Sequence, residues 1–134
     1  DHFKAINDQF GHVAGDTCLR LVAQVIAGPP TGSARLVARL GGEEFGVLIA
    51  DATPGEAMAV AEAIRQALAQ APWRAVDAQL QAATVSIGLC CGHGPLDGDA
   101  LYAHADAALY AAKRNGRDRI ETAHLSAAAG LKAG

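Results

Sequence analysis

The chain of 134 residues lacks the features that mark several classes of protein. Its cysteines number only three, Cys18, Cys90 and Cys91, an odd count without Cys-x-x-Cys spacing, which argues against a disulfide framework and for a reducing compartment. Its histidines form no His-Glu-x-x-His or His-x-x-x-His pair, so we expect no zinc site. The apolar runs are too short to span a bilayer, and no signal pattern is visible. We therefore expect a cytoplasmic domain, with a membrane tether left open for any longer parent protein.

An excess of positive charge is also absent. Lys and Arg number 11 against 14 Asp and Glu, so the formal net charge is −3. This balance excludes the broad basic face of a duplex-DNA-binding protein, and we expect no DNA partner. Hydrophobic residues make up 51% of the chain, which excludes disorder and suffices for the core of one domain. Because the chain opens on Asp1 without an initiator Met, we expect it to be a piece of a longer protein.

The spacing of apolar side chains predicts a succession of helices and strands. Helical spacing predicts helices over 15–27, from Thr53 to Pro72, and from Leu101 to Asn115-Gly116. Alternation predicts strands over 34–40, 45–49, 84–89 and 119–122. We predict the element order α-α-β-β-α-β-α-β, which indicates an α/β sandwich of the α+β class with a largely antiparallel sheet. We assign residues 1–123 to the domain and find no pattern in the tail, 124–134.

Local signals mark the ends of three of these elements. Gly41-Gly42 between two alternating runs predicts the turn of a hairpin. Thr53-Pro54-Gly55-Glu56 predicts a helix start at which Thr53 is the cap and Glu56 can close a capping box. Trp73, next to Pro72 at the end of the same helix, is most simply a packing residue.

Glu43 and Glu44 follow the two glycines directly. They are either solvated acids of a tight turn or part of a site where a phosphate approaches the bare glycine backbone. Successive strand residues point to opposite faces, so the two carboxylates are not expected to do the same job. One of them could face a Mg²⁺ ion, but a single carboxylate is a poor cage, and Asp1 is the nearest partner by type.

Asn7 and Asp16 form a second group, in and just after a turn-like stretch at 7–12. Asp16 beside Gly15 would suit the cap of the helix at 15–27. The functional alternative is purine recognition, because an aspartate accepts the N–H donors of guanine and an asparagine amide both donates and accepts. Such a pair rejects adenine, whose polar groups would be left unpaired.

Lys113 and Arg117 are four residues apart at the end of the last predicted helix. Cations there complement the helix dipole, which is the simpler interpretation. The alternative is a clamp on terminal phosphates, in which arginine supplies a fork and lysine a point charge. Lys4 could add a third cation to that clamp.

Taken together, these segments resemble the GGDEF family of diguanylate cyclases. The matching blocks occur in family order from residue 1 to about 120 and are Asp1–Asp8, Gly11-His12, Gly15-Asp16, Arg39–Phe45, Val85–Gly88, Ala105–Lys113 and Gly116-Arg117. The signature here is the variant Gly-Gly-Glu-Glu-Phe. The combination is specific, whereas each block alone is not.

The resemblance implies a ferredoxin-like, nucleotidyl-cyclase-like fold and a reaction that joins two GTP molecules into cyclic di-GMP with release of two pyrophosphates. Two domains would face each other as a homodimer, each holding one GTP, under the control of an amino-terminal sensor or receiver domain. By position, Glu43 is the expected ligand of Mg²⁺ or Mn²⁺, and the expected catalytic residues are Glu43 and Glu44, its supporting acid. The positions that match substrate contacts are Phe3, Lys4, Asn7, His12, Asp16, Gly42, Lys113 and Arg117.

Two departures from the family pattern carry expectations. The family's first strand ends in Asp-x-Asp, and Asp1 matches the second Asp, so the first Asp ligand and the carbonyl donor would lie upstream. The chain as written should therefore bind Mg²⁺–GTP weakly, even if its parent is active. Many relatives also carry an inhibitory Arg-x-x-Asp where this chain has Gly32-Ser33-Ala34-Arg35, so we expect no product-inhibition site of that type. Asp118, where the family usually has Asn, has no assigned effect.

Two other classes of function compete with the enzyme. The first is a degenerate GGDEF module that binds GTP, cyclic di-GMP or a protein partner for regulation, but the intact Gly41–Phe45 segment favours the enzyme. The second is a plain ferredoxin-like interaction domain, which leaves the clustered motifs unexplained. Turnover of GTP by the domain with its upstream strand restored, compared with Glu43→Ala, separates the three.

Overall fold

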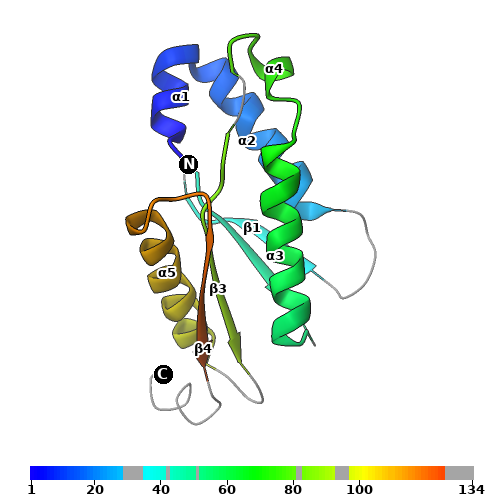
Figure 1. Cartoon of the computed structure of the whole chain (residues 1–134), viewed down its shortest axis with the longest axis vertical. Helices are drawn as coiled ribbons and strands as arrows, with labels where there is room; N and C mark the ends of the chain where they lie inside the picture. The colour runs from blue at the N-terminus through cyan, green and yellow to red at the C-terminus, as the bar shows by residue number, and fades with distance from the viewer. Residues whose placement is uncertain (29–34, 42, 51, 81–82, 93–96, 126–134) are drawn as a thin grey trace. The chain divides into compact units, whose positions relative to one another are not determined.

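The computed structural model describes residues 1–28, 35–41, 43–50, 52–80, 83–92 and 97–125 (Figure 1). It divides into two compact units, of which the first comprises Asp1–Ala52 with Gln66–Ala83 and the second Thr53–Arg65 with Thr84–Gly134. Both units contain helices and strands, which confirms the mixed α+β class. Within the described residues, no helix is both long and apolar enough to cross a membrane.

The first unit opens with two helices, α1 (Phe3–Phe10) and α2 (His12–Ala27), separated by a single residue. That residue is Gly11, whose φ of 92° lies in a region that side chains with a Cβ rarely adopt, so the first helix stops there and the second begins. The prediction of a turn at 7–12 is therefore wrong, because the chain stays helical through Phe10. The start predicted for the second helix is three residues late.

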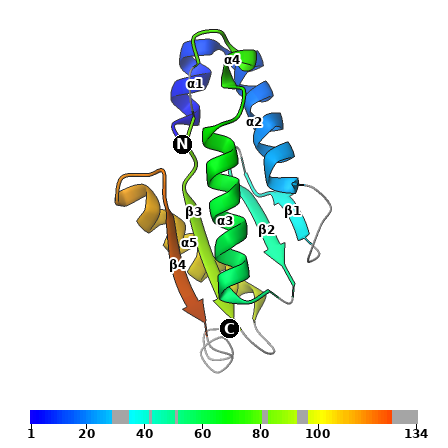
Figure 2. The ribbon, with the colours of Figure 1, turned by 45° about the vertical axis from the view of Figure 1, so that its right-hand side comes forward.

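A hairpin of β1 (Arg35–Arg39) and β2 (Phe45–Ile49) follows in the same unit (Figure 2). The strands pair antiparallel with Arg39 opposite Phe45, and the Leu40 N–H donates to the Glu44 carbonyl at 2.8 Å to close the loop. The predicted hairpin is confirmed. Of the two glycines predicted to form its turn, Gly41 is exposed in this loop, and Gly42 lies outside the described residues.

Helix α3 (Pro54–Ala69) begins as its sequence predicts. The Glu56 N–H donates to Thr53 Oγ1 at 3.1 Å, which confirms Thr53 as the cap, while the return bond from the Glu56 side chain stays a prediction. The apolar face of the helix is buried at Ala57, Ala61, Ile64 and Leu68.

A short helix, α4 (Trp73–Val76), follows α3 and was not predicted. Trp73 is 2% exposed, and its Nε1–H donates to the Leu68 carbonyl at 2.6 Å. Trp73 is thus a packing residue, as expected. It also satisfies a carbonyl in the last turn of α3 that has no partner within the helix.

The second unit contains β3 (Ile87–Gly92), α5 (Gly98–Arg114) and β4 (Ile120–Leu125). The two strands pair parallel, with Ile87 opposite Ile120, and α5 packs against both (Figure 1). The prediction of largely antiparallel pairing holds for the hairpin and is wrong for this pair. The reason is the helix between the strands, which carries the chain back so that β4 runs in the direction of β3. β4 extends to Leu125, and the assignment of 124–134 to a tail stays a prediction.

Candidate functional site

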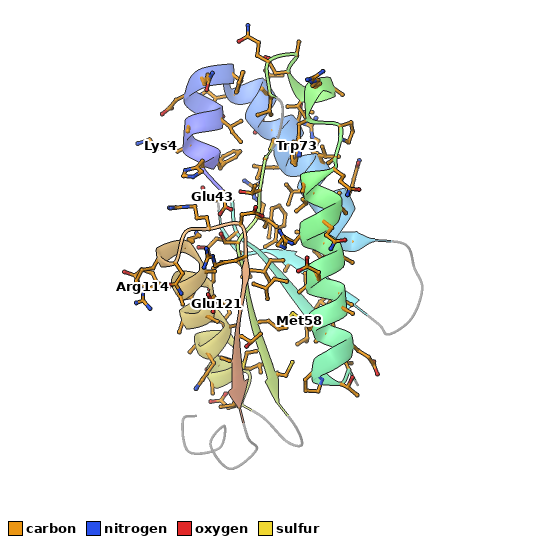
Figure 3. The ribbon with its side chains drawn as sticks, in the orientation of Figure 1. Lys4, Glu43, Met58, Trp73, Arg114 and Glu121 are labelled. Carbon is orange, nitrogen blue, oxygen red and sulfur yellow. The ribbon has the colours of Figure 1, made fainter. Side chains whose placement is uncertain are left out.

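The two glutamates of the signature lie in the hairpin loop, with Glu43 exposed and Glu44 half-buried. Figure 3 labels Glu43 in this loop. Because β2 begins only at Phe45, the two carboxylates are not on alternate faces of a strand, as the sequence argument assumed. They differ in exposure, and the expectation that the two carboxylates have different functions stays a prediction. At the β1 end of the loop, Arg39 Nε donates to the Gly41 carbonyl at 3.3 Å.

Helices α1 and α2 bring together Phe3, Asn7 and His12, three of the predicted substrate residues. The Asn7 amide nitrogen Nδ2 lies 3.0 Å from His12 Nδ1, and since an amide nitrogen only donates, the imidazole nitrogen accepts. A Cβ placed on Gly15 would collide with Asn7 Oδ1 and lie 3.3 Å from Phe3 Cζ. The bare backbone of Gly15 therefore makes room for the Asn7 side chain, a role that the sequence analysis missed. A glycine inside an otherwise regular helix is the signal that points to it.

Asp16 is the fifth residue of α2 and is exposed. The residue at the cap position is Gly11, so the interpretation of Asp16 as a helix cap is wrong. No acidic residue lies in the first turn of α2, which removes the simplest structural reason for an aspartate there. Purine contact by Asp16 stays a prediction.

The predicted cations lie on different elements. Lys4 is exposed on α1, as Figure 3 shows, and belongs to the first unit. Lys113 lies in the last turn of α5 and is half-buried, a position that suits the helix dipole as expected. Arg117 lies beyond the helix, also half-buried, and its N–H donates to the Ala112 carbonyl at 2.9 Å.

The turn after α5 is held by an arginine that the sequence analysis did not single out. Arg65 of α3 donates from Nη1 to Asp118 Oδ1 at 3.1 Å and from Nη2 to Glu62 Oε1 at 2.6 Å. These hydrogen bonds, that to Glu62 first, raise the pKa of Arg65 above its usual range. Asp118, a carboxylate where the family usually has an amide, is a departure visible in the sequence, but nothing in the sequence pointed to Arg65 as its partner.

Comparison with known proteins decides the family. A family described as "Diguanylate cyclase, GGDEF domain" matches residues 1–119. The chain belongs to the GGDEF family. It is 42% identical over 123 residues to the diguanylate cyclase DgcP of Pseudomonas aeruginosa, covering 92% of this chain and 18% of that protein. The GGDEF domain thus spans less than a fifth of the length of this curated relative.

Solved structures agree with the family and the fold. The active GGEEF domain of a diguanylate cyclase from Vibrio cholerae superposes with a TM-score of 0.77 at 35% identity, over 91% of this chain and 76% of that one. The GGDEF domain of DgcB from Caulobacter crescentus, solved in complex with c-di-GMP, gives a TM-score of 0.73 at 39% identity, over 91% and 72% of the two chains. The resemblance and the nucleotidyl-cyclase-like fold class are confirmed.

Proposed function

We propose that this GGDEF domain is the catalytic domain of a diguanylate cyclase, which condenses two GTP molecules into cyclic di-GMP and releases two pyrophosphates. The observation that carries the proposal is the hairpin loop of a GGDEF family member with both acids of its signature present and the Glu43 carboxylate exposed. An exposed carboxylate at a loop end, next to glycine, is accessible to a large polyanionic substrate and its counter-ion.

Guanine recognition is assigned to the first unit. Asn7 and Asp16 supply an amide and a carboxylate, which match the donor and acceptor pattern of guanine and leave adenine with unpaired groups. His12 acts on this pair through Asn7, since their 3.0 Å hydrogen bond restricts the rotation of the amide. Phe3 borders the same group, because its ring lies near the position that a Gly15 Cβ would take.

Phosphate binding is assigned to Lys4, Lys113 and Arg117. The guanidinium of Arg117 can form two parallel bonds to a phosphate, whereas the lysines act as point charges. Within the second unit, Lys113 and Arg117 give a domain of net charge −3 local positive charge that suits a phosphate. The backbone of Gly42, which lies outside the described residues, stays a predicted contact.

The family also implies a divalent cation, Mg²⁺ or Mn²⁺, and the donors present fit such an ion. Among the described residues no group of three or more His, Cys, Asp or Glu side chains could hold a metal by itself. Magnesium with a nucleotide needs fewer, because one or two carboxylates suffice when substrate phosphates and water complete the shell. Glu43 would be the protein ligand and Glu44 its support. When bound, the ion neutralises charge on the leaving pyrophosphate.

The reaction requires two domains, because the 3′-hydroxyl of one GTP attacks the α-phosphate of the other. We therefore propose a homodimer of domains as the active species, with GTP as substrate and cyclic di-GMP as product. The expected amino-terminal sensor or receiver domain would bring the two together. A cytoplasmic location follows from the use of GTP. Dimer formation mainly positions the two GTP molecules, and such positioning can remove a large share of the activation barrier of a reaction between two bound polyanions.

The test is turnover of Mg²⁺–GTP by the chain extended at its amino terminus with a strand that ends in Asp-x. Glu43→Gln removes the charge of the proposed ligand, and Glu56→Gln makes the same change at an exposed position in the first turn of α3, where Gln still suits a capping box. We expect cyclic di-GMP from the unsubstituted domain and from Glu56→Gln, and a loss of at least about 100-fold for Glu43→Gln.

Two results would overturn the proposal in favour of its alternatives. Binding of GTP or cyclic di-GMP without turnover, in the extended domain with Mg²⁺, would identify a regulatory module. Neither binding nor turnover would leave an interaction domain.

The absence of an Arg-x-x-Asp inhibitory site is a further proposal, since Gly32, Ser33 and Ala34 lie outside the described residues. Submicromolar binding of cyclic di-GMP that persists in Glu43→Gln would contradict it.

A further inference from the structure

The turn between α5 and β4 has an unusual backbone. Three successive residues, Gly116, Arg117 and Asp118, have φ of 119°, 64° and 45°. Glycine adopts such angles freely, but a residue with a Cβ is crowded against its own carbonyl there. Arg117, the proposed phosphate contact, is thus held in a conformation that the isolated chain would rarely populate.

Most of the contacts that hold this turn are local. The Arg117 N–H donates to the Ala112 carbonyl at 2.9 Å, and Arg119 Nε donates to the Arg117 carbonyl at 3.1 Å. Asn115 Nδ2 reaches Glu121 Oε1 at 3.2 Å. Two printed contacts come from far away in the sequence. The Ile87 N–H donates to the Arg119 carbonyl at 3.0 Å, and Arg65 Nη1 donates to Asp118 Oδ1 at 3.1 Å, between residues 53 positions apart.

Arg65 is itself fixed before it reaches the turn. Its Nη2 and Nε both face the Glu62 carboxylate, at 2.6 and 3.3 Å, in a two-point contact on the same face of α3. The exposed fractions of the side chains are 27% for Arg65, 39% for Glu62 and 47% for Asp118. A guanidinium held at two points loses less freedom on making its third bond, so the contact with Asp118 is pre-organised.

We propose that Arg65 is a positioning residue for Arg117. By binding Asp118, it stabilises the left-handed turn in which Arg117 is presented to the phosphates of GTP. The proposal rests on the proposed function for the role of Arg117. It also gives Asp118 a role. The Asp118 carboxylate offers Arg65 a charged acceptor, whereas the more usual asparagine would offer only a neutral oxygen.

The experiment measures GTP affinity with Mg²⁺ and the steady-state constants in the extended chain, for Arg65→Ala, Arg117→Ala and the double variant. We expect Arg65→Ala to weaken GTP binding and raise KM about fivefold with kcat changed less than about twofold. Arg117→Ala should weaken GTP binding about tenfold or more. Adding Arg65→Ala to it should weaken GTP binding no further, because Arg65 acts only through the phosphate contact of Arg117. Arg74→Ala, which removes an exposed arginine of α4, is the matched control and should change none of these values.

Hydrogen exchange at the Arg117 amide tests the turn without GTP. Its N–H bonds to Ala112, so loosening of the turn in Arg65→Ala should speed exchange about tenfold, and Arg65→Gln should be intermediate. Unchanged exchange in a folded Arg65→Ala, or affinity losses that add in the double variant, would overturn the positioning role. If the unsubstituted chain binds no GTP, the proposed function fails, and the exchange rates still decide whether Arg65 holds the turn.

Discussion

Gly88 of β3 lies directly against the backbone of Leu109 in α5. A Cβ on Gly88 would be 2.8 Å from Leu109 Cα and would collide with the Leu109 nitrogen and the Ala105 carbonyl oxygen. These are backbone atoms of one helix, so they cannot move aside singly. The glycine of the Val85–Gly88 block is therefore a packing residue that sets the distance between strand and helix.

Gly88→Ala should consequently destabilise the domain, by roughly 3 kcal/mol or more, because α5 must shift away from the strand. Chemical denaturation followed by circular dichroism measures the loss. Gly98→Ala is the control: it lies at the start of the same helix with nothing within 4 Å of the added Cβ. Equal stability of the two variants would show that α5 accommodates the methyl group.

Gly15→Ala should separate stability from GTP binding. Its added methyl would meet only the flexible ends of the Asn7 and Phe3 side chains, and alanine favours the helix by up to about 1 kcal/mol, so the free energy of unfolding should stay equal or rise. Displacement of Asn7 should weaken GTP binding about tenfold and reduce the preference for GTP over ATP. Gly55→Ala in α3, whose Cβ meets only Thr53 Oγ1 at 4.0 Å, should leave the affinity unchanged. Full GTP affinity in Gly15→Ala would refute the assignment of Asn7.

Trp73→Phe should cost about 1 kcal/mol, because it removes the indole N–H from the buried Leu68 carbonyl, which keeps only the longer bond from the Ala71 N–H at 3.3 Å. Circular dichroism is the suitable probe, since Trp73 is the single tryptophan of the chain. Tyr102→Phe on the exposed surface of α5 removes a hydroxyl with little expected effect. A loss for Trp73→Phe no greater than for Tyr102→Phe would contradict the importance of the bond.

Cys18 should react slowly with iodoacetamide in the folded domain at about pH 8. Burial raises the pKa of its thiol, which lowers the fraction of the reactive thiolate. Because the folded pKa lies above the unfolded one, its contribution to stability is fully present below the unfolded pKa and is lost as the pH rises through the folded pKa. The free energy of unfolding should therefore fall above about pH 8.5. Mass spectrometry of alkylated peptides checks the first expectation, and rapid labelling of Cys18 would contradict it.

The elements of the fold were predictable where a local signal decides them. Thr53 has the side chain that caps a helix, and the paired glycines at 41–42 interrupt two alternating runs, so the α3 start and the hairpin follow from neighbouring residues. The start of α2 was missed because Gly15-Asp16 looks like a helix beginning, while the break at Gly11 depends on a backbone angle that composition alone does not reveal.

Partners distant in the sequence were harder to predict. The patterns at 84–89 and 119–122 indicate strands but carry no information about their direction, although the helix between them favours parallel pairing. Within the candidate site, residue type and order pointed to Asn7, Asp16 and Glu43. The contact between Arg65 and Asp118 could not be predicted, because it exists only once α3 and the turn after α5 are both formed.

The parallel pair has a consequence for the order of folding events. β3, α5 and β4 are consecutive in the chain, and the paired residues Ile87 and Ile120 are 33 positions apart, so this pairing closes the shorter loop and loses less chain entropy. The bond from Arg65 to Asp118 spans 53 positions and closes a longer loop. We therefore expect the strand–helix–strand core to form early, and the turn that carries Arg117 to acquire its final order late, when α3 arrives.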